Sequence, residues 1–256
     1  MAFFISGNCI CMDVKKCNVF KLNIVATDLD SAVKLVESGL DNLSGKYITF
    51  SNVHTTVMAA DNEKYAHIQN NAEYIFADGA PIAWYQRKKG FQNAKRVAGP
   101  DFMKAIFELS EEKGYRHFFY GSSEEVLASL EKELKAEYPT ILMKTYAPPF
   151  EKKLDRDYSA DIQMMNDFVP DFVWIGLGAP KQELWMYKNQ DKLKAPMFGV
   201  GAGFDFHAKT TKRAPLWMQN CGLEWLYRLF HNPAKYLGRY FYSNLRFLFL
   251  LLKTGH

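Results

Sequence analysis

Short runs rich in β-branched and aromatic residues alternate with longer helical patterns between residues 46 and 206. This alternation predicts an α/β protein with a Rossmann-like, mostly parallel sheet and helices on both of its faces. The predicted strands span residues 46–53, 73–77, 116–121, 141–146, 171–177 and 196–201. The predicted helices lie near residues 55–70, 81–89, 101–113, 123–137, 155–168 and 180–192. A capping box of Ser122 and Glu125 is expected to begin the helix near 123–137.

The chain has 256 residues, of which 48% are apolar and 15% aromatic, so it can form one full-sized core plus an appendage. The cysteines lack nearby histidines at metal-binding spacing, and we expect reduced thiols at Cys9, Cys11, Cys17 and Cys221. The first 17 residues show no signal-peptide pattern, and the longest apolar run, 247–252, is too short to span a bilayer. These features predict a cytoplasmic protein.

The net charge of +4 is concentrated at the C-terminal end of the chain. From His207 to His256 there are eight Lys or Arg residues and a single acid, Glu224, so this part carries +7 and the rest −3. We therefore expect an α/β core over residues 1–209 and a basic, aromatic helical tail over residues 210–256 that meets an anionic partner. No nucleic-acid partner is expected.

The tail mixes aromatic and basic residues at helical spacing, with a break at Pro233, which is typical of amphipathic helices at a membrane interface. An alternative for its first half is that its large apolar side chains simply complete the core, namely Trp217, Trp225, Leu226, Leu229 and Phe230. From Lys235 onward the apolar residues exceed what one small helix can bury. This excess favours binding to an anionic membrane surface or self-association into a homo-oligomer.

Polar or glycine-rich segments follow most of the predicted strands. They include Asn52 with His54, "ADGAP" at 77–81, "GSS" at 121–123, "GLGAPKQE" at 176–183 and "GAGFDFH" at 201–207. Because the carboxyl ends of parallel strands meet at one edge of a sheet, these segments are expected to converge on a single ligand site.

Several residues at this edge have a functional and a structural interpretation. "GLGAPKQE" could seat a phosphate on its free backbone N–H groups beside Lys181, or it could be a tight turn with surface side chains. Asp78 could be a general base, although capping of the following helix is the commoner role and is favoured from the residue pattern alone. Arg96 could clamp a diphosphate or lie exposed at the surface.

Two Asp-x-Asp pairs, at 28–30 and 155–157, have the spacing with which many sugar-nucleotide enzymes hold a divalent metal. Both pairs begin helical stretches instead of ending buried strands, which favours helix capping. The histidines show no metal-ligand spacing. We therefore expect no metal cofactor.

Six segments together resemble one family: "SNVHTT", "ADGAPIAW", "KRVAGPDFM", "WIGLGAPKQELWM", "GAGFDFHA" and "KRAPLWMQNCGLEWLYRLFHNP". Their order and spacing resemble the WecG/TagA/CpsF glycosyltransferases, glycosyltransferase family 26, over nearly the whole chain from about Asn23 to about Phe249. The resemblance implies an inverting, metal-independent hexosyltransferase in cell-surface polysaccharide or teichoic acid synthesis. Its implied substrates are a UDP-sugar donor and a polyprenyl-diphosphate-linked sugar, at the inner face of the bacterial plasma membrane.

The resemblance also assigns roles to individual residues. Asp78 matches the family's proposed general base, and Asn52, Arg96 and Gln182 match positions that line the same pocket. The segment containing Gly176, Gly178, Lys181, Gln182 and Glu183 resembles a donor nucleotide and sugar site. Asp205 matches a structural or sugar-binding position. Arg213 and Arg228 of the tail match arginines that close over the donor diphosphate.

Two positions depart from the family pattern. Phe50-Ser51 replaces a more usual Thr-Pro, so a hydroxyl contact is lost or shifts to Ser51. Ala80-Pro81 varies the usual "DGxG", which leaves the identity of the transferred sugar open. A nucleotide-dependent oxidoreductase is one alternative, but the dinucleotide fingerprint is missing after the first strand. A non-catalytic nucleotide binder at the membrane is the other.

Overall fold

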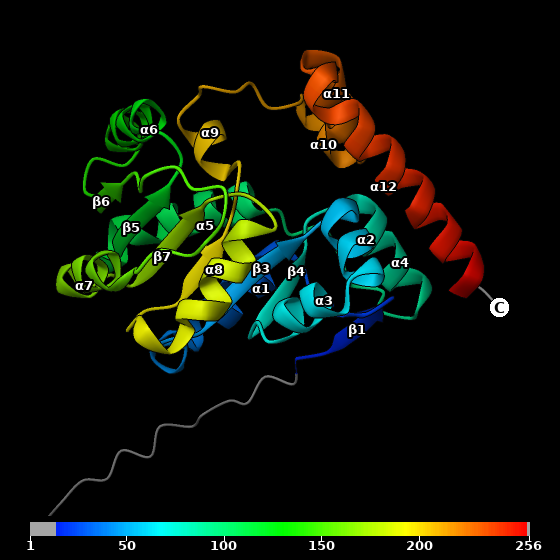
Figure 1. Ribbon diagram of the computed structural model, residues 1–256, viewed down its shortest axis with the longest axis horizontal. Helices are drawn as coiled ribbons and strands as arrows, with labels where there is room; N and C mark the ends of the chain where they lie inside the picture. Colours follow the sequence, from blue (N-terminus) through cyan, green and yellow to red (C-terminus); the bar gives the residue numbers. More distant parts are fainter. Residues whose placement is uncertain (1–13, 255–256) are drawn as a thin grey trace, which may run out of the picture.

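A six-stranded parallel sheet forms the centre of the computed structural model, with the strand order β4-β3-β8-β7-β5-β6 (Figure 1). The structure describes residues 14–254, apart from the side chains of Asn220 and Lys235. Cys9, Cys11 and most of the first 17 residues, which were considered for a signal-peptide pattern, therefore lie outside the described residues. The strands are β3 (Tyr47–Ser51), β4 (Tyr74–Ala77), β5 (Arg116–Gly121), β6 (Leu142–Tyr146), β7 (Phe172–Gly176) and β8 (Met197–Gly199). The predicted α/β fold and all six predicted strands are confirmed.

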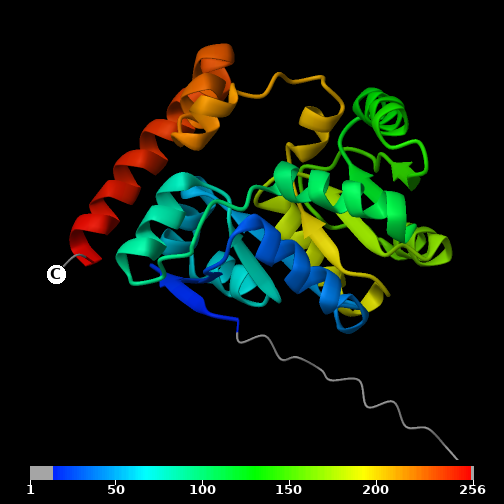
Figure 2. The same cartoon turned by 180° about the vertical axis from the view of Figure 1, so that it is seen from behind.

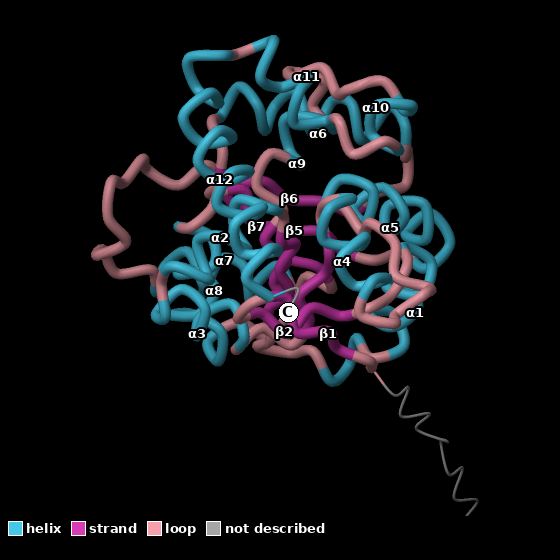
Figure 3. The backbone as a smooth tube through the Cα atoms, turned by 90° about the vertical axis from the view of Figure 1, so that its right-hand side faces the viewer, coloured by secondary structure: helices cyan, strands magenta, loops and turns pink. Residues whose placement is uncertain are grey.

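Helices cover both faces of this sheet (Figures 2 and 3). One face packs against α1 (Leu29–Ser38), α5 (Gly99–Lys113), α6 (Glu124–Glu137) and α9 (Gly203–His207). The other face packs against α2 (Val53–Asp61), α3 (Glu63–Asn70), α7 (Ser159–Phe168) and α8 (Lys181–Asn189). Helix α4 (Ala80–Lys88) and the antiparallel hairpin of β1 (Lys16–Val19) and β2 (Leu22–Val25) lie beyond β4.

The two faces are filled by alternate residues of the same strands. In β7, Phe172 and Trp174 belong to the core on the α5 side, whereas Val173 and Ile175 belong to the core on the α8 side. Phe102 of α5 is fully buried, and its ring lies 5.5–6.4 Å from the rings of Phe50, Phe76, Trp174 and Phe198. This aromatic layer fixes α5 against β3, β4, β7 and β8.

Local details differ from the predictions at two helix boundaries. The single helix predicted near 55–70 is two helices, because Asn62 ends α2 and its side chain accepts a hydrogen bond from the Tyr65 N–H of α3 at 3.0 Å. The predicted capping box at Ser122 is wrong. Ser122 adopts a left-handed backbone conformation (φ 65°), and Ser123 instead caps α6 by accepting from Val126 N–H at 3.4 Å.

The C-terminal region forms three helices: α10 (Leu216–Asn220), α11 (Glu224–His231) and α12 (Pro233–Thr254). An extended segment leads from α9 to α10, and α12 then runs back along α2 (Figure 1). The α12–α2 contact includes a hydrogen bond between Ser243 and His54 (2.9 Å) and a bidentate ion pair of Arg246 with Asp61. Phe247 is buried beside Phe20.

The opposite side of the C-terminal helices carries large exposed apolar side chains. On α12 these are Leu237, Phe241, Leu245, Leu248, Phe249 and Leu252, and on α10 and α11 they are Leu216, Trp217 and Phe230. The first-half alternative, in which five side chains complete the core, is wrong for Trp217 and Phe230, which are 62% and 75% exposed. The other three, Trp225, Leu226 and Leu229, are half-buried. No helix between residues 14 and 254 has the length and apolar character needed to cross a membrane.

Candidate active site

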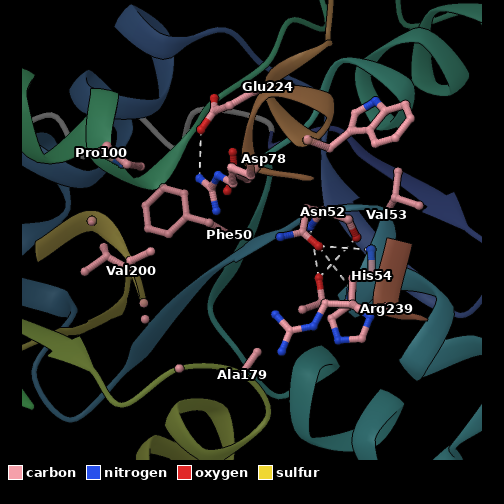
Figure 4. Close-up of a pocket in the computed structure, with 18 of the residues that line it drawn as sticks. Phe50, Asn52, Val53, His54, Asp78, Pro100, Ala179, Val200, Glu224 and Arg239 are labelled. Atoms are coloured by element: carbon pink, nitrogen blue, oxygen red, sulfur yellow. Dashed lines mark hydrogen bonds and ion pairs between the residues drawn. The ribbon is translucent and has the colours of Figure 1, made fainter. Parts of the chain in front are cut away.

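A cavity of about 430 Å³ lies at the carboxyl ends of the strands, between the sheet and the C-terminal helices (Figure 4). The loops after β3, β4, β7 and β8 supply one wall, and α11 and α12 supply the other. The strands end at the same level, since Ser51 pairs with Ala77 and Gly121 with Gly176. The expected convergence of strand-end segments on one site is thus observed for Asn52, Asp78, Gly176 and Gly201.

Asp78 follows β4 and lines this cavity. It does not cap the next helix: α4 begins at the N-cap Gly79, with no capping hydrogen bond from a side chain, so the capping interpretation is wrong. Asp78 Oδ1 instead lies 3.9 Å from Arg96 Nε. Burial raises the pKa of the Asp78 carboxyl to about 6, because the Arg96 charge offsets only part of the cost of desolvation. Such a carboxylate can take up a proton near neutral pH.

Three arginines and two further carboxylates surround Asp78. Arg96 donates to Glu224 at 2.9 Å and to Asp101 at 3.3 Å. Arg228 donates to Glu224 at 2.7 Å, and Arg213 donates to Asp101 at 3.0 Å. We refer to Asp78, Asp101, Glu224, Arg96, Arg213 and Arg228 as the charged cluster.

The charged cluster joins the α/β core to the tail. Asp78, Arg96 and Asp101 belong to the core, whereas Arg213, Glu224 and Arg228 come from the segment after residue 209. Although burial opposes it, the charge and hydrogen bond of Glu224 hold the pKa of Arg228 above its usual value. Arg96 and Arg228 line the cavity, so their guanidinium groups face a space that an anionic ligand could enter.

Asn52 and His54 form the wall at the start of α2 (Figure 4). Asn52 Oδ1 caps the helix by accepting from His54 N–H (3.0 Å) and Thr55 N–H (3.2 Å), which leaves its NH₂ group for a ligand. Burial, and to a lesser degree the charge of Arg239, lowers the pKa of His54 to about 4. Ser51 lies below this wall, fully buried, with its hydroxyl 3.0 Å from Thr55 Oγ1, so it is not brought to the cavity surface.

Gln182 and Glu183, at the start of α8, line the cavity floor. Gly176, Gly178 and Asp205 also line it. A side chain at position 176 would collide with the Phe204 ring, since a Cβ there would lie 2.6 Å from Phe204 Cε2. Glycine at this position is therefore required by the packing of α9 against β7.

Lys181 points away from this group. Its ammonium donates to the backbone carbonyl of Glu151 and lies 4.8 Å from the ring centre of Phe150. It lines a second cavity of about 600 Å³, together with Tyr120, Ser123 and Trp185. Gly176 and Leu177 line both cavities, so the two are neighbours along the same sheet edge.

The residue pattern did not identify several residues that line the main cavity: Glu224, Arg239, Tyr240 and Ser243. Glu224 had one detectable signal, because it is the single acid in a strongly basic tail and stands four residues before Arg228. The others depend on how α12 crosses α2, which no local pattern encodes.

The first Asp-x-Asp pair caps a helix, because Asp28 is the N-cap of α1 and accepts from Ser31 N–H at 3.0 Å. For the second pair the capping interpretation is wrong: Asp157 accepts from Ser159 N–H at 3.0 Å, but the N-cap of α7 is Tyr158 and no side chain caps that helix. Within residues 14–254, no group of three or more His, Cys, Asp or Glu side chains is arranged to hold a metal ion. The positive charge around Asp78 comes from arginines.

The chain matches the model of the "Glycosyl transferase WecG/TagA/CpsF family" over residues 17–256. It is 30% identical over 218 residues to the N-acetylglucosaminyldiphosphoundecaprenol N-acetyl-beta-D-mannosaminyltransferase of Bacillus spizizenii, covering 84% of this chain and 83% of that protein. Proteins of the same name from Bacillus subtilis and Staphylococcus aureus are 28% and 24% identical, over 85% and 84% of this chain and 84% and 86% of theirs.

The charged cluster predicts the effect of Glu224→Gln. The Glu224 carboxylate is paired with Arg96 and Arg228, so an anionic ligand that binds these arginines must displace it. Glutamine has the same shape but no charge, so the variant should bind inorganic pyrophosphate about tenfold more tightly than the wild type. The dissociation constant is measured by calorimetry at low and at physiological salt. Glu131→Gln, which removes a glutamate paired with Lys135 on the surface of α6, is the matched control. Weaker pyrophosphate binding by Glu224→Gln would show that Glu224 holds the arginines in their binding geometry instead.

Proposed function

Because the chain belongs to the WecG/TagA/CpsF family of glycosyl transferases, we propose that it moves a sugar from a UDP-sugar to a polyprenyl-diphosphate-linked sugar with inversion. The sugar is of the N-acetylmannosamine type or a related hexose or uronic acid. The product belongs to cell-surface polysaccharide or teichoic acid synthesis. The names of the relatives support the transferred sugar class and the lipid-linked acceptor.

The position of Asp78 is the observation that most directly supports this proposal. Its carboxylate lies at a strand end, lines the cavity, does not cap a helix and stands beside the charged arginines. In the proposed reaction Asp78 takes the proton from an acceptor hydroxyl while that oxygen bonds to the anomeric carbon of the sugar. The bond between the anomeric carbon and the phosphate oxygen breaks on the opposite side, and UDP leaves with that electron pair.

The arginines supply the second half of the chemistry. Arg96 and Arg228 line the cavity, and Arg213 is linked to them through Asp101 and Glu224. Their charges would stabilise the negative charge that grows on the departing diphosphate, the task that a divalent cation performs in other glycosyltransferases. The adjoining second cavity, with its aromatic walls and Lys181, has room for the nucleoside half of the donor.

The exposed apolar face of the C-terminal helices supports attachment to the cytoplasmic face of the plasma membrane. Phe241, Leu245, Leu248 and Leu252 lie on the side of α12 that does not pack on α2, and all are more than half exposed. An amphipathic helix of this kind can bury its apolar face at the boundary between headgroups and acyl chains. A lipid-linked acceptor would then reach the cavity from the membrane side.

Asp78→Asn is expected to lower turnover by about a hundredfold or more, the usual scale for a lost general base. Because the base acts as the carboxylate, and its pKa is raised to about 6, wild-type kcat/KM should rise with pH through about 6. This rise of kcat/KM with pH should be absent in Asp78→Asn. Product formation is followed by mass spectrometry with a panel of UDP-sugars and a short-chain polyprenyl-diphosphate-N-acetylglucosamine.

Two controls accompany the Asp78 experiment. Asp157→Asn alters an exposed aspartate that lines neither cavity and should leave turnover unchanged. The affinity of Asp78→Asn for UDP should stay close to that of the wild type, because the arginines remain in place. Near-full activity of Asp78→Asn across the pH range would remove Asp78 from the reaction.

We also expect activity to survive EDTA, because Arg96, Arg213 and Arg228 bring positive charge to the site. Initial rates are compared before chelation, after chelation, and after addition of Mg²⁺ or Mn²⁺. A rate that falls on chelation and returns with the metal would contradict this expectation.

Replacing Phe241, Leu248 and Leu252 together by serine should abolish co-sedimentation with liposomes that contain anionic lipid. The triple variant retains Ser243, Arg246 and Phe247, which hold α12 to α2, so its melting temperature should change little. The matched control replaces two exposed apolar residues elsewhere, Leu142 and Val169. If the triple variant co-sediments like the wild type, or if it changes only from an oligomer to a monomer, this face is not the membrane contact.

A further inference from the structure

Glu183 is a buried carboxyl group at the floor of the main cavity. Its side chain is 1% exposed, and Gln182 beside it is 5% exposed. Burial raises the pKa of Glu183 to about 7, and the groups that face it are uncharged ones: Gln182 on its own helix, Tyr65 from α3 and Tyr47 from β3. A carboxyl group buried at such a cost calls for a specific task.

The hydrogen bonds of Gln182 fix the orientation of its amide group. Gln182 Nε2 donates to the backbone carbonyl of Gly199 at 3.1 Å and to Glu183 Oε1 at 2.9 Å. Since the Gly199 carbonyl can only accept, the NH₂ group must face it, and both of its hydrogens are then used. The Gln182 amide oxygen is therefore the part of this amide that remains available to accept a hydrogen bond.

The neighbouring glycines leave room for this arrangement. A Cβ at position 199 would lie 3.2 Å from Gln182 Nε2 and 2.6 Å from Met186 Cε. At position 201 it would lie 3.4 Å from Gln182 Oε1, in a backbone conformation (φ 52°) that favours glycine. "GVGAG" at 199–203 therefore holds the amide in place as well as forming a turn.

Two buried oxygen atoms at this floor have no hydrogen-bond partner among the described residues: Gln182 Oε1 and Glu183 Oε2. Both belong to residues that line the cavity. An unpaired buried acceptor destabilises the fold, so a ligand group that donates a hydrogen bond here would recover the lost interaction. The hydroxyl and acetamido N–H groups of a sugar are donors, whereas a diphosphate offers only acceptors.

We propose that Glu183 is a positioning residue, which holds the Gln182 amide so that its oxygen accepts a hydrogen bond from an O–H or N–H group of the transferred sugar. This role rests on the proposed function and adds the place at which the sugar, as distinct from UDP, is recognised. Of these two residues, Gln182 contacts the sugar and Glu183 acts through Gln182.

A chain of buried hydrogen bonds supports Glu183 from below. Thr49 Oγ1 donates to Gln69 Oε1 at 2.7 Å, and Gln69 Nε2 donates to Tyr65 Oη at 2.8 Å. The Tyr65 hydroxyl keeps its own hydrogen, and its nearness to Glu183 partly offsets the effect of burial, which raises the Glu183 pKa. Thr49 and Gln69 are fully buried, so the support is rigid.

The test compares two replacements of Glu183. Glu183→Gln keeps an oxygen that can accept from Gln182 Nε2, so kcat/KM for the UDP-sugar should stay within about threefold of the wild type. Glu183→Met keeps the length but has no such acceptor, so kcat/KM should fall about thirtyfold, mainly through KM, while the affinity for free UDP is unchanged. Melting temperatures are measured for both, and the Gln variant reports on the role even if the Met variant unfolds.

A double-mutant cycle shows whether Glu183 acts through Gln182. In a Gln182→Ala background, Glu183→Met should cause no further loss, because the amide that it orients is gone. Additive losses would overturn the positioning role, as would a Glu183→Gln variant as impaired as Glu183→Met, which would mean that the charge itself is needed. These outcomes are distinct from failure of the proposed function, which would appear as no turnover by the wild-type chain with any UDP-sugar.

Discussion

Parallel hydrogen bonding among the six strands is the constraint on which the rest of the structure depends. A parallel sheet needs a crossover between consecutive strands, so every strand leaves the sheet at the same edge and every helix returns the chain to the other. The loops after β3, β4, β7 and β8 are thereby brought within one cavity although they lie up to about 150 residues apart. Phe102 and the aromatic rings around it keep these strand ends in register with α5, which carries Asp101.

The charged cluster is a second constraint, because its parts come from both sides of the cavity. Three arginines and three carboxylates balance in charge, so the cluster can be largely enclosed without a ligand. In the proposed function, a diphosphate would therefore exchange one set of ion pairs for another. Such an exchange would keep binding reversible, as the proposed release of UDP after each reaction requires.

Much of the fold and part of the site could be predicted from the sequence. Strand positions were predictable because buried parallel strands are continuous apolar runs, such as Phe172–Gly176, bounded by turn residues. Asp78 at a strand end was identifiable as a candidate, but whether it caps a helix depends on the backbone at Gly79, which the residue types leave open. The same limit explains Ser122 and Ser123: either hydroxyl could cap α6, and the left-handed turn at Ser122 decides between them.

The tertiary contacts of the tail were beyond local patterns. The spacing of apolar residues predicts that α12 is amphipathic, but both its buried side and its exposed side contain large apolar residues, such as Phe247 and Phe241. Polar contacts with α2 decide which side of α12 is buried: Asp61 binds Arg246, and His54 binds Ser243. Sequence alone could not pair residues more than 180 positions apart.

The position of α12 links the two surfaces that the proposed function requires. One side of the helix closes the cavity through Arg239 and Ser243, while the other side exposes Phe241 and Leu248. A movement of α12 at a membrane would therefore also shift α11, which contacts α12 and contributes Glu224 and Arg228 to the charged cluster. Because His54 is neutral and its contact with Ser243 is uncharged, the helix is held to α2 at this point by a bond that salt does not screen. The ion pairs of Glu224 and Asp61 are the contacts that an anionic surface or an anionic substrate can rearrange.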